Sequence, residues 1–364
     1  MVVLAGCGAD GVVDPSSSSS AAGTTGAPST STDTATATSD PTTTSSATED
    51  GTTTMGDASW EVAFEADESL GALFSVWGPN AAVVYAVGGQ QGEAGLSTGT
   101  MLVRSANAWA SVALPDATPK LNWIHGAQTL RVAVGERGAI LMRDGDDAAT
   151  PWVTQSCATV LPLWGTWVGA SDDVWAVGGD GFDRPPVLCH YDGLEWTNVE
   201  LPELSIDAKA LFKVFGLASD DVWAVGDAGL LLHYDGTAWE QVVVDTPADL
   251  ISLWGNGPDE LLAVGGRANG VLARYDGAAW TIEALAEAPG LNGVWMDGGG
   301  EAHVVGIGGT ILALDPGSLA PTLELAPTIL TLHAVWSPGD GSFIAVGGSL
   351  EMPPPLVGII VEKN

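Results

Sequence analysis

Residues 219–242 read SDDVWAVGDAGLLLHYDGTAWEQV, and this stretch decides the fold. The segment VGDAG separates two apolar runs, and DG separates the second run from a third that contains Trp239. Because Gly and Asp clusters between apolar runs mark turns, the stretch holds three candidate strands joined by two turns. Asp-Gly readily adopts positive φ at both central positions, so we expect Asp235 and Gly236 to form a two-residue type I′ hairpin.

The same pattern recurs along the chain. An apolar residue followed by Ala-Val-Gly, or by Val-Val-Gly in one copy, appears seven times at intervals of 39 to 48 residues. A Leu-rich segment that usually ends in an aromatic residue precedes each copy, and a DG turn with a Trp follows several of them, so each unit contains four strands. The glycines that end the seven copies are Gly88, Gly135, Gly178, Gly226, Gly265, Gly306 and Gly347.

Four strands in a repeat of about 40 to 45 residues are typical of a β-propeller blade. The sequence therefore predicts an all-β protein, a seven-bladed β-propeller of four-stranded antiparallel blades, over residues 59–364. The seventh unit ends at GIIVEKN without its Trp strand, whereas SWEVAF begins at Ser59, before the first full unit. We expect this N-terminal strand to complete the last blade and so close the ring.

The N-terminal 58 residues have a different composition. Residues 8–58 are dominated by Ser, Thr, Ala, Asp and Pro, which cannot bury enough apolar surface to offset the entropy of ordering. We therefore expect a disordered Ser/Thr-rich stalk ahead of the propeller. No apolar run approaches the length of a transmembrane helix.

Residues 1–7 end in LAGC, Leu4 to Cys7, which resembles the lipobox of bacterial lipoproteins. In that family the signal peptidase cuts before a Cys that then carries the lipid, which implies lipidation at Cys7. Residues 1–3 lack the basic and apolar regions of a signal peptide, so either the true start lies upstream or the match is accidental. Because Ala9 stands where the inner-membrane retention residue Asp would be, the resemblance implies export to the outer membrane.

Two cysteines remain if Cys7 is acylated. Cys157 lies in the connection that enters the third blade, and Cys189 lies in the third strand of that blade. They form either one disulfide in an oxidising compartment or two buried free thiols, and the sequence leaves both interpretations open.

The charge limits the partners. The chain has 45 acidic and 11 basic residues, and seven of the acids precede Trp60, so the propeller carries a net charge of −27. Such a surface excludes nucleic acid as a partner and leaves the lipid anchor as the membrane contact. Pairs of acids such as Asp172-Asp173 and Asp220-Asp221 are expected to be solvated turns, with Ca²⁺ ligation as the alternative. We expect no other metal and no cofactor.

No catalytic constellation stands out. The DGxxW turns resemble the Asp-box of sialidase-type propellers, but Asp and Gly are adjacent here and the Ser is missing. Tyr191, Tyr234 and Tyr275 all occupy the position before DG, and His190 and His233 recur beside it, so packing explains them. The remaining His125, His303 and His333 lie in different blades, too scattered for a metal site.

The repeats resemble the VWAVGxxGxIxHYDGxxW propellers of secreted Gram-negative lipoproteins. They are more distantly similar to the propellers of photosystem assembly factors and pilus-tip adhesins. Because the shared residues pack blades together, the resemblance implies a scaffold whose function resides in its loops.

The connections between second and third strands differ among blades. They are short in the second, fourth and sixth blades and longer in the first, third and seventh, with a small expansion in the fifth. These connections share one face, so the longer ones create a candidate binding face, with neutral drift in loops as the alternative. The candidate residues are Gln90, Gln91, Phe182, Arg184, Arg267, Leu350 and Met352.

These observations favour a monomeric, surface-tethered, non-catalytic module that binds a protein or glycan. Two alternatives remain open: a secreted propeller hydrolase or lyase that uses carboxylates near the central channel, and an envelope assembly or adhesion factor.

Overall fold

The computed structural model describes residues 59–92, 96–106, 108–299, 301–314, 320–349 and 355–364. The predicted lipobox, the lipidation site Cys7 and the stalk over residues 8–58 lie outside these residues, as do Leu350 and Met352. Among the described residues, no helix is long and apolar enough to cross a membrane.

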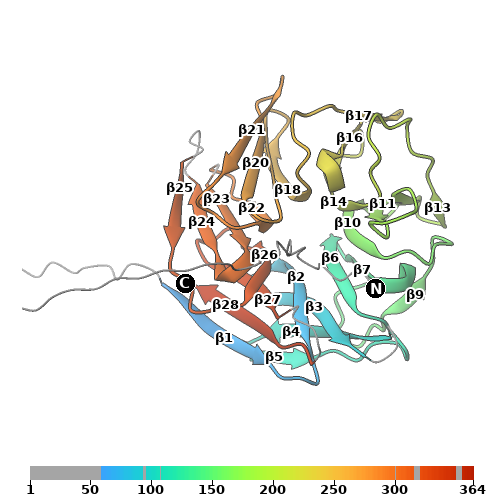
Figure 1. Cartoon of the computed structure of the whole chain (residues 1–364). Coiled ribbons are helices and arrows are strands. Elements are labelled where there is room, and N and C mark those ends of the chain that lie inside the picture. Colours follow the sequence, from blue (N-terminus) through green and yellow to red (C-terminus); the bar gives the residue numbers. More distant parts are fainter. Residues whose placement is uncertain (1–58, 93–95, 107, 300, 315–319, 350–354) are drawn as a thin grey trace, which may run out of the picture. The chain divides into compact units, whose positions relative to one another are not determined.

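The described chain forms seven four-stranded antiparallel sheets arranged around a centre, which confirms the predicted seven-bladed β-propeller (Figure 1). Blade 1 holds β2 (Ala72–Asn80), β3 (Val83–Gln91), β4 (Ser97–Ser105) and β5 (Ala108–Ser111). Blade 2 holds β6 (Leu121–Ala127), β7 (Leu130–Gly135), β8 (Ile140–Asp144) and β9 (Val153–Gln155). Blade 3 holds β10 (Leu163–Ala170), β11 (Asp173–Gly178), β12 (Val187–Tyr191) and β13 (Trp196–Asn198).

The next three blades repeat this order. Blade 4 holds β14 (Leu211–Ala218), β15 (Asp221–Gly226), β16 (Leu231–Tyr234) and β17 (Trp239–Gln241). Blade 5 holds β18 (Leu250–Gly257), β19 (Glu260–Gly265), β20 (Gly270–Tyr275) and β21 (Trp280–Leu285). Blade 6 holds β22 (Leu291–Met296), β23 (Ala302–Gly306), β24 (Ile311–Leu314) and β25 (Pro321–Glu324). Three short 3₁₀ turns connect second to third strands: η2 (Glu136–Gly138), η3 (Asp227–Gly229) and η4 (Ile307–Gly309).

Blade 7 is built from both ends of the propeller. Its inner strands are β26 (Thr331–Trp336), β27 (Phe343–Gly348) and β28 (Gly358–Lys363), and its outer strand is β1 (Trp60–Ala66). β1 pairs antiparallel with β28, with Trp60 opposite Lys363 and Ala66 opposite Gly358. This pairing confirms the predicted closure by the N-terminal strand.

The repeated motif is explained by packing between neighbouring blades. Trp175 of blade 3 lies against Tyr234 and Trp239 of blade 4, with ring centroids 5.2 and 5.1 Å apart. Trp223 of blade 4 makes the same contacts with Tyr275 and Trp280 of blade 5, at 5.2 and 5.6 Å. The strand-two Trp and the Tyr and Trp that flank DG therefore form one interface, so both faces of each second strand are buried.

The recurring histidines belong to the same interface. His190 and His233 lie over Trp175 and Trp223, with centroids 4.2 and 3.9 Å apart. Their Nε2 atoms lie 3.0 and 2.9 Å from the carboxylates of Asp173 and Asp221. The second acid of each pair, Asp173 or Asp221, thus contacts a histidine of its own blade. The described residues contain no group of three or more side chains that could hold a metal ion.

The predicted type I′ hairpin at Asp235-Gly236 is wrong. Tyr234 pairs with Trp239, so the loop has four residues, and only Gly236 has positive φ, at 86°. The Asp235 carboxylate accepts N–H bonds from Thr237 and Ala238, at 2.8 and 2.9 Å, which stabilises the longer turn. Gly236 is also required by space, because a Cβ there would lie 2.6 Å from the Cβ of Asp220.

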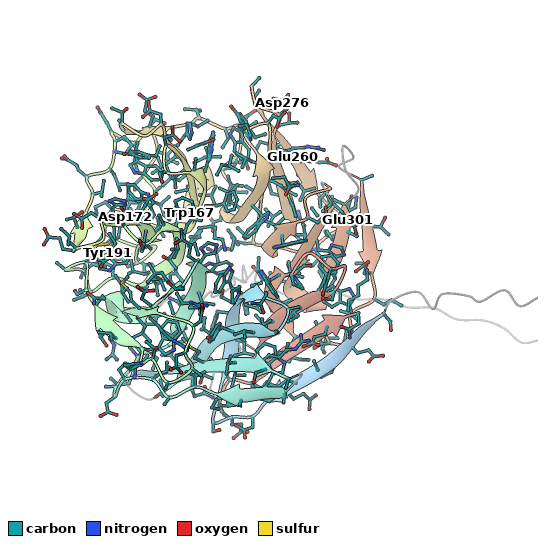
Figure 2. The ribbon with its side chains drawn as sticks, turned by 180° about the vertical axis from the view of Figure 1, so that it is seen from behind. Trp167, Asp172, Tyr191, Glu260, Asp276 and Glu301 are labelled. Carbon is teal, nitrogen blue, oxygen red and sulfur yellow. A yellow bond between two sulfur atoms is a disulfide. The ribbon has the colours of Figure 1, made fainter. Side chains whose placement is uncertain are left out.

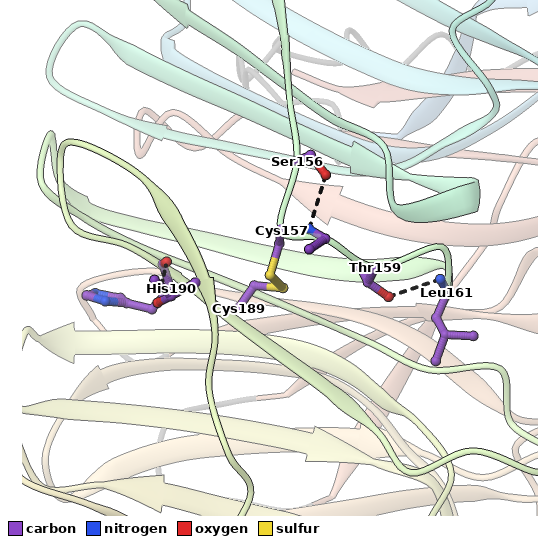
Figure 3. Close-up of a disulfide and its surroundings, with 8 residues drawn as sticks. Ser156, Cys157, Thr159, Leu161, Cys189 and His190 are labelled. Atoms are coloured by element: carbon purple, nitrogen blue, oxygen red, sulfur yellow. Dashed lines mark hydrogen bonds between the residues drawn. A yellow bond between two sulfur atoms is a disulfide. The ribbon is translucent and has the colours of Figure 1, made fainter.

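Cys157 and Cys189 are joined by a disulfide in the structure (Figure 3). Their Cα atoms lie 6.2 Å apart, and both residues are buried in the core shared by blades 2 and 3. The bond ties the connection that enters blade 3 to the third strand of the same blade.

Candidate functional site

The antiparallel order gives the propeller two distinct faces. Hairpins between first and second strands and between third and fourth strands lie on one face, which we call the hairpin face. Connections between second and third strands and between successive blades lie on the other, which we call the crossover face. In Figure 1 the first strands surround the centre and the fourth strands form the rim.

Exposed apolar side chains are distributed unequally between these faces. Among the described residues, seven exposed large hydrophobic residues lie in crossover-face connections and one, Leu194, lies in a hairpin-face connection. Three others, Val62, Val153 and Leu323, lie on rim strands. Those on the crossover face are Leu96, Val160, Phe182, Val243, Ile307, Leu325 and Ile329.

Exposed acids lie on both faces. Figure 2 shows Asp172, Glu260, Asp276 and Glu301 in the outer part of the disc, whereas Trp167, on an innermost strand, lies nearer the centre. Asp172 and Asp276 stand in hairpin-face turns, and Glu260 begins the second strand of blade 5. Exposed acids such as Asp183, Asp207 and Asp245 also lie in crossover-face connections, so the two faces differ in exposed apolar side chains and not in acidity.

The predicted residues of blade 3 lie in this surface. Phe182 is 58% exposed, and its loop is fixed by Asp180, whose Oδ1 accepts N–H bonds from residues 182, 183 and 184. The Nε atom of Arg184 lies 3.8 Å from Oδ2 of Asp180. Phe182 and Arg184 are thus presented to solvent on an ordered loop.

Arg267 of blade 5 also lies on the crossover face. Its Nε atom is 2.5 Å from Oδ2 of Asp249, and its guanidinium lies 5.6 Å from the centre of the Phe212 ring. Phe212 belongs to the innermost strand of blade 4, so Arg267 connects the loops of this face to the inner part of the ring.

The side-chain amide of Gln90 is engaged in hydrogen bonds within the protein. Its Nε2 donates to the backbone oxygens of Glu68 and Leu356, at 2.7 and 3.0 Å, and its Oε1 accepts from the Leu356 N–H. Gln90 therefore holds blade 1 against blade 7, and the neighbouring Gln91 is half-buried. The structure does not bring these two side chains together with Phe182 and Arg184, which lie two blades away.

A β-bulge is repeated in the innermost strand of every blade, immediately after its first Leu. Bulges re-aim side chains at barrel rims and functional sites. Here the bulged residues bridge adjacent blades: the amide of Asn122 donates to Leu163 O at 2.9 Å, and Phe74 stacks on His333 at 4.9 Å. The seven residues are Phe74, Asn122, Trp164, Phe212, Ile251, Asn292 and His333.

In the innermost strand of blade 4, Lys213 directly follows the bulged residue Phe212. Its amine lies against the Trp123 ring of blade 2. Gly165, in the intervening blade 3, leaves room for the backbone of Lys213, because a Cβ at position 165 would lie 3.0 Å from the Lys213 Cα. Burial lowers the pKa of Lys213 well below 10.5. Among the described residues, no carboxylate forms an ion pair with it.

The innermost strands β2, β6, β10, β14, β18, β22 and β26 contain no Asp or Glu. Their titratable groups are Lys213, His125 and His333. Burial, with a smaller effect of Lys213, lowers the pKa of His125 to about 3, and burial, with a smaller effect of Lys120, lowers that of His333 to about 4. Both imidazoles are neutral near pH 7.

Sequence reasoning missed most of the exposed apolar residues on the crossover face. Val160, Val243, Leu325 and Ile329 lie in connections between blades, whereas the predicted binding face consists of connections between second and third strands. A signal was present, because each stands among Pro, Thr or Asp residues shortly before the first Leu of the next blade.

No protein-family model matches the chain, and no curated protein matches its sequence. Solved structures match its fold. The WD40 β-propeller domain of Doa1 superposes with a TM-score of 0.61 at 10% identity, covering 83% of this chain and 96% of that one. YCF48 bound to a D1 peptide gives a TM-score of 0.49 at 15% identity, covering 66% and 91%. The first similarity supports the propeller fold, and neither assigns a ligand.

Proposed function

We propose that this protein is a non-catalytic binding module that holds a protein partner on its crossover face and is tethered to the cell surface through Cys7 and residues 8–58. The observation that carries the proposal is the unequal distribution of exposed apolar side chains, seven on the crossover face against one on the hairpin face among described residues. Large apolar patches on a soluble domain mark interaction surfaces, and these seven side chains share one face although they come from several blades.

The chemistry of the face fits a protein partner. Aromatic and Arg side chains are enriched at the centres of protein interfaces, and Phe182, Arg184 and Arg267 supply them here. The net charge of −27 on the propeller attracts positively charged partners and accelerates their association. We therefore infer a partner with an apolar patch surrounded by Lys and Arg.

The innermost strands argue against the hydrolase alternative. General acid and base catalysis by carboxylates needs at least one Asp or Glu within reach of the substrate. The strands that surround the channel carry none, and their two histidines are buried and neutral near pH 7. A carboxylate mechanism would therefore have to take its acid and its base from the connections at the ends of these strands, such as those that hold Asp227 and Asp249.

The binding face is tested by comparing variants of the two faces. We expect the triple substitution Phe182→Ser, Leu325→Ser and Ile329→Ser to weaken capture of envelope proteins at least tenfold, because interface centres depend on a few apolar anchors. The thermal transition should stay unchanged, since these residues are 58%, 89% and 87% exposed. Capture is quantified from solubilised envelope fractions, with a glycan array run in parallel.

Leu194→Ser is the matched control, because Leu194 is 89% exposed and lies on the hairpin face. It should capture the same partners as the unsubstituted protein. Undiminished capture by the triple variant, or loss of capture in the control, would place the binding site away from the crossover face. A glycan that binds without any protein partner would contradict the partner class.

The tether is tested separately. When the protein is produced in a Gram-negative host from its native gene, labelled palmitate should be incorporated, and Cys7→Ser should abolish the label because acylation requires that thiol. Cys189→Ser is the control and should remain labelled. Labelling that survives Cys7→Ser would refute the lipoprotein assignment while leaving the binding face untouched.

A further inference from the structure

A cleft of about 460 Å³ lies between blade 1 and blade 2, away from the loops of the candidate binding face. Residues 112–115, which follow β5, form one wall, and residues 148–152, which precede β9, form the other. Most of the lining is apolar, with Val112, Leu114, Pro115, Pro151 and Trp152 among the larger groups. Its size is within the range of pockets that bind small molecules.

Arg143, the penultimate residue of β8, is the one charged residue among those that line this cleft. It is 6% exposed, although a guanidinium remains charged at all ordinary pH values. Its Nη1 donates to the Tyr85 hydroxyl at 3.4 Å and its Nη2 donates to the Asp147 backbone oxygen at 2.6 Å. Among described residues its Nε finds no acceptor, and no carboxylate lies within 4 Å of it.

A second buried guanidinium increases this excess of positive charge. Arg131 is 3% exposed and lies directly opposite Arg143 in the pairing of β7 with β8. Like charges in opposite positions destabilise a sheet. Arg131 forms an ion pair with Asp146 at 2.5 Å, whereas Arg143 has no carboxylate partner among the described residues. The Asp144 carboxylate is engaged by the Thr129 hydroxyl at 2.6 Å.

An uncompensated buried charge is costly, and the cost is removed when an opposite charge binds beside it. A carboxylate suits Arg143, because two of the five guanidinium N–H groups are used and a carboxylate accepts two in parallel. Trp152 lines the cleft, so its indole reports on a ligand that binds there. The apolar walls complement an apolar body attached to the carboxylate.

We propose that the cleft between blades 1 and 2 binds a small organic carboxylate with an aromatic or aliphatic body, held by Arg143. One wall of the cleft belongs to a crossover-face connection, but none of the predicted binding-face residues lines it, so the protein carries a small-molecule site in addition to its partner surface. Carboxylate binding supplies the counter-charge that Arg143 lacks among the described residues.

The test uses benzoate and its neutral analogue benzamide as probes on the full chain. The indole N–H signal of Trp152, assigned with Trp152→Phe, is followed by NMR as each probe is added at low salt. We expect benzoate to shift this signal saturably and benzamide to leave it unmoved. Arg143→Met should weaken benzoate binding at least tenfold, and Arg137→Met, on the η2 turn outside the cleft, should leave it unchanged.

Ala149→Trp is a second variant that keeps Arg143 and fills the cleft from an exposed position. It should also weaken benzoate binding at least tenfold, and it decides the question if Arg143→Met does not fold. The proposal is overturned if benzoate causes no saturable shift, if benzamide shifts the signal equally, or if benzoate affinity is retained in Ala149→Trp.

Discussion

Deletion of residues 1–66 is expected to lower the melting temperature by at least about 10 °C relative to deletion of residues 1–57. The longer deletion removes β1 and leaves β28 as an unpaired edge in blade 7. It also removes Trp60, which is 5% exposed and whose Nε1 donates to Glu324 Oε2 at 2.6 Å. Loss of one buried Trp typically costs about 3 to 5 kcal/mol, and the exposed edge adds to that loss.

The shorter deletion is the control, because it leaves β1 intact. Both proteins are compared by differential scanning calorimetry. Trp60→Ala and Glu61→Ala, made in the protein that keeps β1, separate the contribution of the Trp60 side chain from that of the strand pairing. Glu61 is exposed on the same strand, so its substitution should change little. Equal melting temperatures for the two deletions would contradict the role of β1 in closing the ring.

Acid is expected to destabilise the domain between pH 6.5 and about 4, through the two histidines on the innermost strands. In the folded state the pKa of His125 is about 3 and that of His333 about 4, chiefly because of burial. The unfolded chain binds protons at these groups near pH 6.5, so it takes up more protons than the folded state as the pH falls. Stability is thus fully present above pH 6.5 and is lost toward the folded pKa values.

The loss amounts to about 1.4 kcal/mol per pH unit for each histidine, or roughly 5 kcal/mol for the pair by pH 4.5. That is comparable with the whole stability of many domains. Lys213 beside His125 and Lys120 beside His333 act in the same direction. His303 adds to the effect, since burial, opposed by Glu324, lowers its pKa to about 4.

Urea denaturation at pH 8, 6 and 5 measures this dependence. His125→Gln and His333→Gln should each reduce the slope of unfolding free energy against pH by about one proton below pH 6. The comparison of slopes is independent of any uniform change in stability that the substitution causes. Slopes that match the unsubstituted protein would show that these imidazoles are protonated in the folded state.

The repeats allowed the blades, their number and the closing strand to be predicted, because these follow from local patterns that recur seven times. The turn at Asp235-Gly236 was predicted incorrectly, since the Asp carboxylate stabilises a longer loop and the short-range signal does not include that bond. The bulge that re-aims Phe74, Trp164 and Phe212 was also absent from the prediction. An extra residue becomes visible only when the paired strand is known.

The candidate site was predictable in part. Phe182 and Arg184 were chosen because their loop is long, and they are exposed on the crossover face. Gln90 was chosen for the same reason, but its amide is used between blades 7 and 1. Exposure depends on which connections meet in space, so residues such as Val160 and Ile329 could be recognised only from the assembled ring. The cleft beside Arg143 likewise requires two blades.

The most direct test of the crossover face is site-specific photo-crosslinking in intact cells. A benzophenone amino acid is placed singly at Phe182, at Ile329 or at Leu194, three exposed positions of which the last lies on the hairpin face. We expect the same discrete crosslinked protein from positions 182 and 329 and none from position 194. A crosslink from position 194 alone, or equal crosslinks from all three, would contradict the assignment of the binding face.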